Sequence, residues 1–167
     1  IVWVLQEEAE EDILRLGGVS ESEMNQSIGR STKRRFIWLF LNLLTAILAS
    51  YVISLFDASI EKMVALAVLM PIVASMGGNA GTQTLTLTVR SLAIKELVKN
   101  NRKKVFLKEI TISILNGFIF AILTGVAAYL WFEDLSLSII VGAAMIINIL
   151  SAGLFGFLIP YIFDKIK

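Results

Sequence analysis

The chain has 167 residues, of which 56% are hydrophobic and 17% are charged, and its formal net charge is +1. It contains no cysteine and no histidine, which excludes disulfides, thiolate metal sites and imidazole ligands. The apolar residues occur in long uninterrupted runs that a soluble domain of this size would not tolerate. The composition therefore indicates a membrane protein.

Four uncharged runs are long enough to cross a bilayer, whose hydrocarbon core takes about 20 residues of helix. We expect an all-α, polytopic membrane helix bundle with four spanning helices and an N-terminal cytoplasmic amphipathic helix. The expected spans are residues 36–56, 63–89, 110–132 and 135–163. A charged segment precedes the first run, so that run does not resemble a cleaved signal peptide.

Basic residues are concentrated before the first span, between the second and third spans, and after the fourth. By the positive-inside rule these segments are cytoplasmic, so both ends of the chain are expected to face the cytosol in a multi-pass protein of the cell membrane. A transmembrane domain over 36–163 then lies between a cytoplasmic segment at 1–35 and a cytoplasmic end at 164–167. Topology and contact with anionic lipid explain the basic loop at 90–109, so no nucleic-acid partner is expected.

Residues 1–16 form a short amphipathic, acidic segment, in which the apolar residues that could pack are Trp3, Leu5, Ile13, Leu14 and Leu16. Five carboxylates lie within residues 7–12. Gly17 and Gly18 fit the C-terminal end of a helix there, because glycine tolerates the left-handed conformation found at that position. Ser20 to Glu23 is typical of a capping box that opens a second short helix.

The stretch from Pro71 to Arg90 loses its apolar character without acquiring a charge before Arg90. In a helix that turns about 100° per residue, its polar side chains lie on one face and its small residues on the opposite face. The polar face needs water or partners, and the small-residue face favours close approach of another helix. The polar face comprises Ser75, Asn79, Thr82, Gln83, Thr86 and Arg90, and the opposite face comprises Gly77, Gly81, Thr84 and Thr88.

Pro71 lies inside the second span, where it has no amide hydrogen to donate. The carbonyl of Ala67 therefore loses its helical partner, and we expect a helix kink at Pro71.

The four spans contain no Asp, Glu, Lys or Arg. Proton-coupled transporters and intramembrane metalloenzymes ordinarily need ionisable groups at depth, so we expect no enzymatic activity. The second span does offer neutral oxygen atoms, which suit a hard cation that keeps its water, as Mg²⁺ does. The same groups also suit plain helix packing, and the residues alone leave both interpretations open.

The run MPIVASMGGNAGTQTLTLTVRSLA, Met70 to Ala93, closely resembles the signature of the second transmembrane helix in MgtE-type magnesium channels, which are related to the solute carrier 41 group. The resemblance extends to EEAEEDILRLGGV before the first span, to FLKEI at the start of the third and to YLWF at its end. It implies a homodimer with a pore on the dimer axis, passing Mg²⁺ down its electrochemical gradient and closed by cytosolic Mg²⁺. The alternative is a non-conducting membrane scaffold whose small-residue helices assemble a complex.

The resemblance also implies roles for particular residues. The expected pore-lining residues are Gly77, Gly78, Asn79, Thr82, Gln83 and Thr86, with Asn79 contacting Mg²⁺ through water. The acidic segment resembles the plug helix of this family, and Glu8, Glu11 and Asp12 then correspond to carboxylates that share regulatory magnesium. A solvated acidic face is the other interpretation of those three residues.

Proteins of this family also carry cytoplasmic sensor domains before the membrane domain and a fifth helix that supplies a carboxylate to the pore. This chain has four spans and none of those domains, so we expect it to be a piece of a longer protein. The partners implied are a second copy of the chain, membrane lipid and N-terminal sensor domains.

Overall fold

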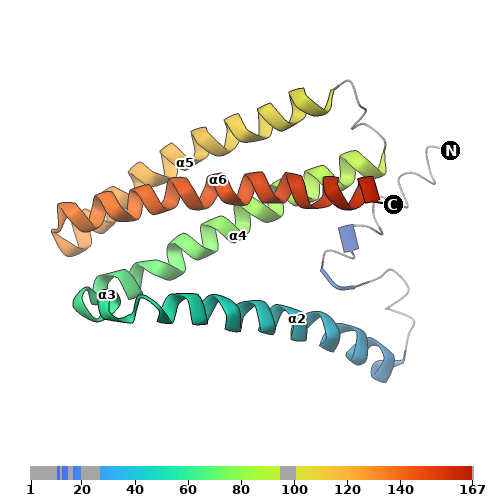
Figure 1. Ribbon diagram of the computed structural model, residues 1–167, viewed down its shortest axis with the longest axis horizontal. Coiled ribbons are helices and arrows are strands. Elements are labelled where there is room, and N and C mark those ends of the chain that lie inside the picture. Colours follow the sequence, from blue (N-terminus) through green and yellow to red (C-terminus); the bar gives the residue numbers. More distant parts are fainter. Residues whose placement is uncertain (1–10, 12, 15–16, 20–26, 95–100, 167) are drawn as a thin grey trace. The chain divides into compact units, whose positions relative to one another are not determined.

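The computed structural model describes residues 11, 13–14, 17–19, 27–94 and 101–166, and over these residues it is helical without strands. Four helices are long and apolar enough to cross a membrane, which confirms the predicted all-α membrane fold. The helices are α2 (Ile28–Ser54), α3 (Asp57–Lys62), α4 (Val64–Ala93), α5 (Arg102–Phe132) and α6 (Leu135–Ile166) (Figure 1).

Two of the helices begin well before the apolar runs that predicted them. The predicted spans start at residues 36 and 110, whereas α2 begins at Ile28 and α5 at Arg102. Long basic side chains continue a helix readily and reach outward to polar surroundings, so a span and its helix need not have the same ends. Residues 57–62, which lie between the first two predicted spans, form the short helix α3, whose first turn carries Asp57 in the position that the helix dipole favours.

The chain divides into two compact units, and the first covers residues 1–62. Its predicted helix end at Gly17 and Gly18 is confirmed, because the amides of Gly17 and Val19 both donate to the carbonyl of Leu14 and Gly18 has φ of +71°. A β-carbon at Gly18 would also overlap the side chain of Trp38. Both the positive φ and the lack of space therefore favour glycine at this position. The predicted capping box at 20–23 lies outside the described residues.

The second unit covers residues 63–167 and is organised around α6. Helix α6 packs along both α5 and α4, whereas α4 and α5 touch each other only slightly. Two small clusters of buried apolar residues hold the three helices together. One contains Leu69, Ala128, Leu137 and Val141, and the other contains Ala121, Met145 and Ile149.

The turn between α5 and α6 is as tight as the sequence predicts. Glu133 ends α5 in the left-handed conformation, with φ of 53°. The carboxylate of Asp134 then accepts hydrogen bonds from the amides of Ser136 at 2.8 Å and Leu137 at 3.1 Å. Asp134 therefore caps the N-terminus of α6 and satisfies two of the amides that a helix start leaves unpaired.

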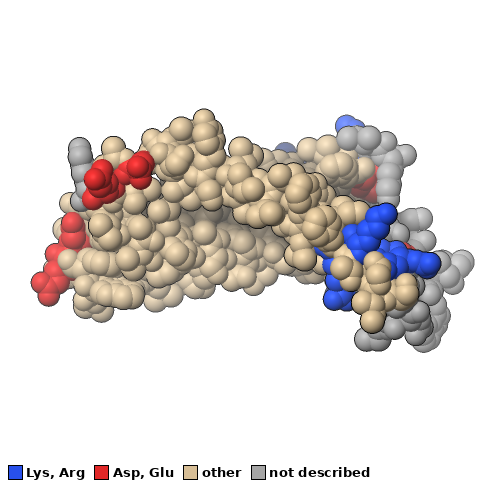
Figure 2. All heavy atoms as spheres, turned by 90° about the horizontal axis from the view of Figure 1, so that it is seen from below, with Lys and Arg blue, Asp and Glu red and all other residues tan. Residues whose placement is uncertain are grey.

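Charged side chains keep to the ends of the helices. On the face that Figure 2 shows, acidic and basic residues lie toward the ends, and the middle of the helices carries none. In the second unit Glu133 and Asp134 lie at the α5–α6 turn. At the other end of α5 the guanidinium of Arg102 donates to the hydroxyl of Tyr161, near the end of α6, and lies 5.1 Å from the centre of its ring.

Three glycines of α6 allow its neighbours to approach closely. Gly142 lies against the carbonyl oxygen of Ala121, and the side chain of Ser113 lies directly over Gly153. A β-carbon at Gly156 would be 2.9 Å from the carbonyl oxygen of Gly81 on α4. Close packing through small residues is how helices associate where lipid removes the hydrophobic driving force.

Replacing Gly156 with alanine should therefore lower the stability of the full-length protein, because the new methyl group meets α4 backbone that cannot move aside cheaply. We expect a loss of about 1–3 kcal/mol, the usual cost of overpacking. Thermal denaturation in detergent measures it. Gly29→Ala is the matched control, since a β-carbon at Gly29 meets nothing within 4 Å. Equal denaturation midpoints for the two variants would contradict this description of the α4–α6 contact.

Candidate functional site

Helix α4 presents a continuous uncharged polar face that α5 and α6, the other long helices of its unit, leave open. Ser75, Gly78, Asn79, Thr82 and Gln83 are all exposed, and one turn further on Thr86 is half-buried. The face ends at Arg90, which is exposed as well. Amide and hydroxyl groups exposed along a helix that could span a membrane need water or polar partners, because lipid cannot satisfy them.

The hydroxyl oxygen of Thr82 is one of the hydrogen-bond acceptors on this face. Thr82 donates its proton to the carbonyl of Gly78 at 2.9 Å. Its oxygen lone pairs are then left to accept hydrogen bonds from water. Together with the amide groups of Asn79 and Gln83, the face offers neutral oxygen atoms without a formal charge.

The opposite face of α4 packs against α6, as the small residues predict. Gly77, Thr84 and Thr88 are buried, and Gly81 lies in ordinary contact with Ala152. The hydroxyl of Thr88 donates to the carbonyl of Thr84 at 2.7 Å, so burying it leaves no unpaired proton. Helix α4 therefore has one face for packing and one face that remains open.

Gly77 lies apart from the other residues that the resemblance assigns to the pore. It is buried, and the side chain of Asn148 from α6 covers it. The other five, Gly78, Asn79, Thr82, Gln83 and Thr86, share the open side of α4.

Pro71 lies within α4, which continues as one helix from Val64 to Ala93. The kink expected at Pro71 stays a prediction.

One carboxylate reaches into the packed region, which the sequence did not indicate. Glu109 lies outside the predicted third span, but α5 already begins at Arg102, and the hydroxyl of Thr84 lies 3.4 Å from the Glu109 carboxylate. An ionisable side chain therefore contacts a residue inside the second predicted span. No local sequence pattern could indicate this contact, because Thr84 and Glu109 lie on different helices and are far apart in the chain.

Among the residues that the structure describes there is no group of three or more Asp, Glu, His or Cys side chains that could hold a metal ion. Two of the three carboxylates predicted to share regulatory magnesium, Glu8 and Asp12, lie outside the described residues. Glu11 is described and is helical.

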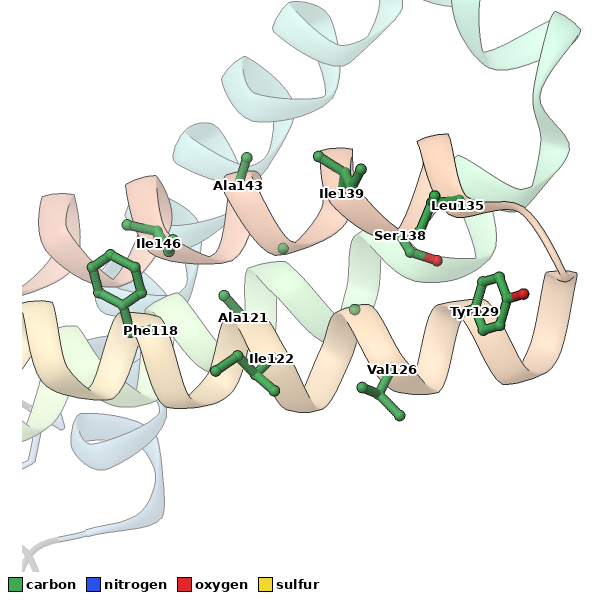
Figure 3. Close-up of a pocket in the computed structure, with 12 residues that line it drawn as sticks. Phe118, Ala121, Ile122, Val126, Tyr129, Leu135, Ser138, Ile139, Ala143 and Ile146 are labelled. Atoms are coloured by element: carbon green, nitrogen blue, oxygen red, sulfur yellow. The ribbon is translucent and has the colours of Figure 1, made fainter.

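A separate groove between α5 and α6 has a volume of about 590 Å³ and a different chemistry. Phe118, Ile122 and Val126 of α5 and Ile139 and Ile146 of α6 line this groove, and Figure 3 shows them along the two adjacent helices. Small residues of both helices, such as Ala121 and Ala143, also line it, and Tyr129 and Ser138 lie toward the end near the α5–α6 turn. Because hydrocarbon dominates its lining and Tyr129 and Ser138 supply only two hydroxyl groups, the groove is poorly suited to a cation.

The two faces of α4 can be distinguished by thiol labelling, because residues 1–167 contain no cysteine and any cysteine elsewhere in the full-length protein can first be replaced by serine. A cysteine at Asn79 or Gln83 should react with a charged, water-soluble thiol reagent in the full-length protein. A cysteine at Thr84 or Thr88 should react at least tenfold more slowly, since those positions are only 6% and 3% exposed. Similar labelling rates at all four positions would show that α4 is turned differently in the membrane.

Comparison with known proteins identifies the class of protein to which this face belongs. Residues 70–167 match the family model of MgtE, described as a divalent cation transporter. The magnesium transporter MgtE of Enterococcus faecalis is 30% identical over 166 residues, which cover 99% of this chain and 37% of that protein. The magnesium transporter MgtE of Thermus thermophilus is 31% identical over 169 residues, with the same two shares.

A third relative, the magnesium transporter MgtE of Bacillus subtilis, is 31% identical over 134 residues, which cover 80% of this chain and 30% of that protein. The chain thus spans about a third of the length of the curated relatives it matches. The family match covers more than half of the chain and includes the whole polar face from Ser75 to Arg90. This chain therefore belongs to the MgtE family of divalent cation transporters.

Proposed function

We propose that the chain forms the conducting part of a magnesium channel, in which two copies enclose a pore and Mg²⁺ passes down its electrochemical gradient. The observation that carries the proposal is the open polar face of α4, from Ser75 to Thr86, in a member of a divalent cation transporter family. The relatives named as magnesium transporters support Mg²⁺ as the ion.

The chemistry of the face suits a hydrated ion. Mg²⁺ loses its water reluctantly and usually keeps several water molecules when it binds a protein. The amide oxygens of Asn79 and Gln83 and the hydroxyl of Thr82 can accept hydrogen bonds from those waters. Neutral oxygens hold the ion less tightly than carboxylates would, so it can move on, which conduction requires.

In the proposed dimer, the open face of α4 lies opposite the same face of a second copy of the chain. The opposite face of α4 is already occupied by α6, so the polar face is the one available to line water. Two such faces opposite each other would enclose a path with polar groups on both sides. Gly77 then lies on the side of α4 away from the pore, where it allows α6 to pack closely, and Gly78 and Asn79 face the ion.

Gating belongs to the acidic N-terminal segment in this proposal. Glu8, Glu11 and Asp12 repel one another unless a cation lies between them, so cytosolic Mg²⁺ bound there favours the closed channel. In this proposal both ends of the chain lie on the cytoplasmic side of the cell membrane, because the basic residues, among them Arg90 and Arg102, favour that side.

Replacing Asn79 with leucine tests the pore face. An apolar side chain cannot hydrogen-bond to the waters of the ion, so we expect Mg²⁺ uptake into liposomes by the full-length protein to fall at least tenfold while dimers still form. Leu87→Asn, at another exposed position of α4, serves as the comparison. Normal uptake by Asn79→Leu together with lost uptake by Leu87→Asn would mean that a different face lines the pore. No uptake by the unaltered protein at any Mg²⁺ concentration would favour a non-conducting scaffold.

Replacing Glu8, Glu11 and Asp12 with the corresponding amides tests the gate. The substitution removes the negative charge that attracts Mg²⁺, so closure should require several-fold more cytosolic Mg²⁺ or fail altogether. Patch recordings with stepped Mg²⁺ on the cytoplasmic side measure this. Unchanged inhibition would assign the three residues to a solvated acidic face.

A further inference from the structure

Asn148, in the middle of α6, is joined to the backbone of α4. Its side-chain amide donates a hydrogen bond to the carbonyl oxygen of Val73. Asn148 is half-buried, and the next residue, Ile149, belongs to the apolar cluster around Met145. A polar side chain at this depth in a spanning helix is stabilised by such a bond, because lipid provides no partner for it.

Gly77 makes this hydrogen bond possible. A β-carbon at Gly77 would overlap the amide group of Asn148, so any larger residue would push the side chain of Asn148 away from α4. Gly78 differs from its neighbour, since a β-carbon there meets nothing within 4 Å. Of the two adjacent glycines, only Gly77 accommodates Asn148.

The bond joins α6 to α4 one turn beyond a missing helical hydrogen bond. Pro71 has no amide hydrogen, so the carbonyl of Ala67 lacks its helical partner, and Val73 lies in the next turn. Val73 is also the residue whose carbonyl faces the amide of Gly77 in a regular helix. Asn148 therefore holds the segment between Pro71 and Gly77, and Asn79 follows it on the open face.

We propose that Asn148 is a positioning residue for conduction: by binding the Val73 carbonyl over Gly77, it sets the rotation of α4 and so directs Gly78 and Asn79 toward the ion path. This proposal rests on the proposed function. Asn148 itself lies on the packed side of α4, so it acts through Val73 and does not contact the ion.

A pair of small substitutions separates hydrogen bonding from packing. Asn148→Ala removes the donor and leaves a gap, whereas Gly77→Ala adds a methyl group that displaces the donor. We expect either change to reduce Mg²⁺ uptake by the full-length protein about fivefold, the factor that corresponds to one interhelical hydrogen bond. In the double variant the methyl group added by Gly77→Ala fills the gap, so the thermal denaturation midpoint should recover while uptake stays as low as in the single variants.

The hydrogen bond can be observed without any transport measurement. Labelling valine carbonyl carbons with ¹³C and alanine nitrogens with ¹⁵N selects the Val–Ala pairs in solid-state NMR of the protein in lipid. Residues 1–167 contain three such pairs, at 64–65, 73–74 and 126–127, and the Val73 signal is assigned by its loss in a Val73→Ile variant. Asn148→Ala and Gly77→Ala should shift the Val73 carbonyl signal and leave the Val64 and Val126 signals in place. Gly78→Ala controls for the loss of a glycine from α4 and should leave the Val73 signal unchanged.

The outcomes are distinct. A Val73 signal that is unaffected by Asn148→Ala would overturn the hydrogen bond. Loss of the bond with unaltered uptake, or full recovery of uptake in the double variant, would overturn the positioning role. Absence of Mg²⁺ uptake by the unaltered protein would refute the proposed function and the conduction role together, but the Val73 signal would still decide whether Asn148 joins α6 to α4.

Discussion

The close approach of α6 to its two neighbours is the contact on which the second unit depends. Within a bilayer, apolar side chains gain nothing by leaving lipid for one another, so helices associate through packing at short range and through hydrogen bonds. Gly153 and Gly156 lie where Ser113 of α5 and the Gly81 backbone of α4 come nearest. Because α6 meets both helices in this way, α4 and α5 need little direct contact.

This packing has a direct consequence for the chemistry of α4. Helix α6 lies against Gly77 and Thr84, Thr88 is buried as well, and the opposite side with Asn79 and Gln83 stays open. The open side carries no charge before Arg90 but is lined by amides and hydroxyls. Such polar groups are seldom exposed in the middle of a spanning helix, because lipid offers them no partners. A charged side chain there would hold a divalent ion strongly, whereas amides and hydroxyls can exchange hydrogen bonds with its water shell.

Asn148 and Glu109 show that the packed side is not purely apolar. Each brings a polar side chain from a neighbouring helix to α4, one to the carbonyl of Val73 and the other to the hydroxyl of Thr84. Such contacts define the rotation of a helix more sharply than apolar contacts do, because a hydrogen bond is lost over a small displacement. The rotation of α4, and with it the direction of its open polar side, is thus set by contacts on the packed side.

The sequence by itself determined the class and the number of spans, since an uncharged run of about 20 residues can satisfy its backbone in lipid only as a helix. It also determined the two faces of α4, because the helical period separates Asn79 and Thr82 from Gly81 and Thr84 whatever packs around them. It did not determine which neighbour covers the small-residue face, because any of the other spans has glycine or small polar residues to offer. Only the tertiary structure decided that α6 does, that Gly77 belongs to the packed side through Asn148, and that Glu109 reaches Thr84. Each of these contacts joins residues distant in the chain, and their distances follow from how whole helices pack, which no local pattern encodes.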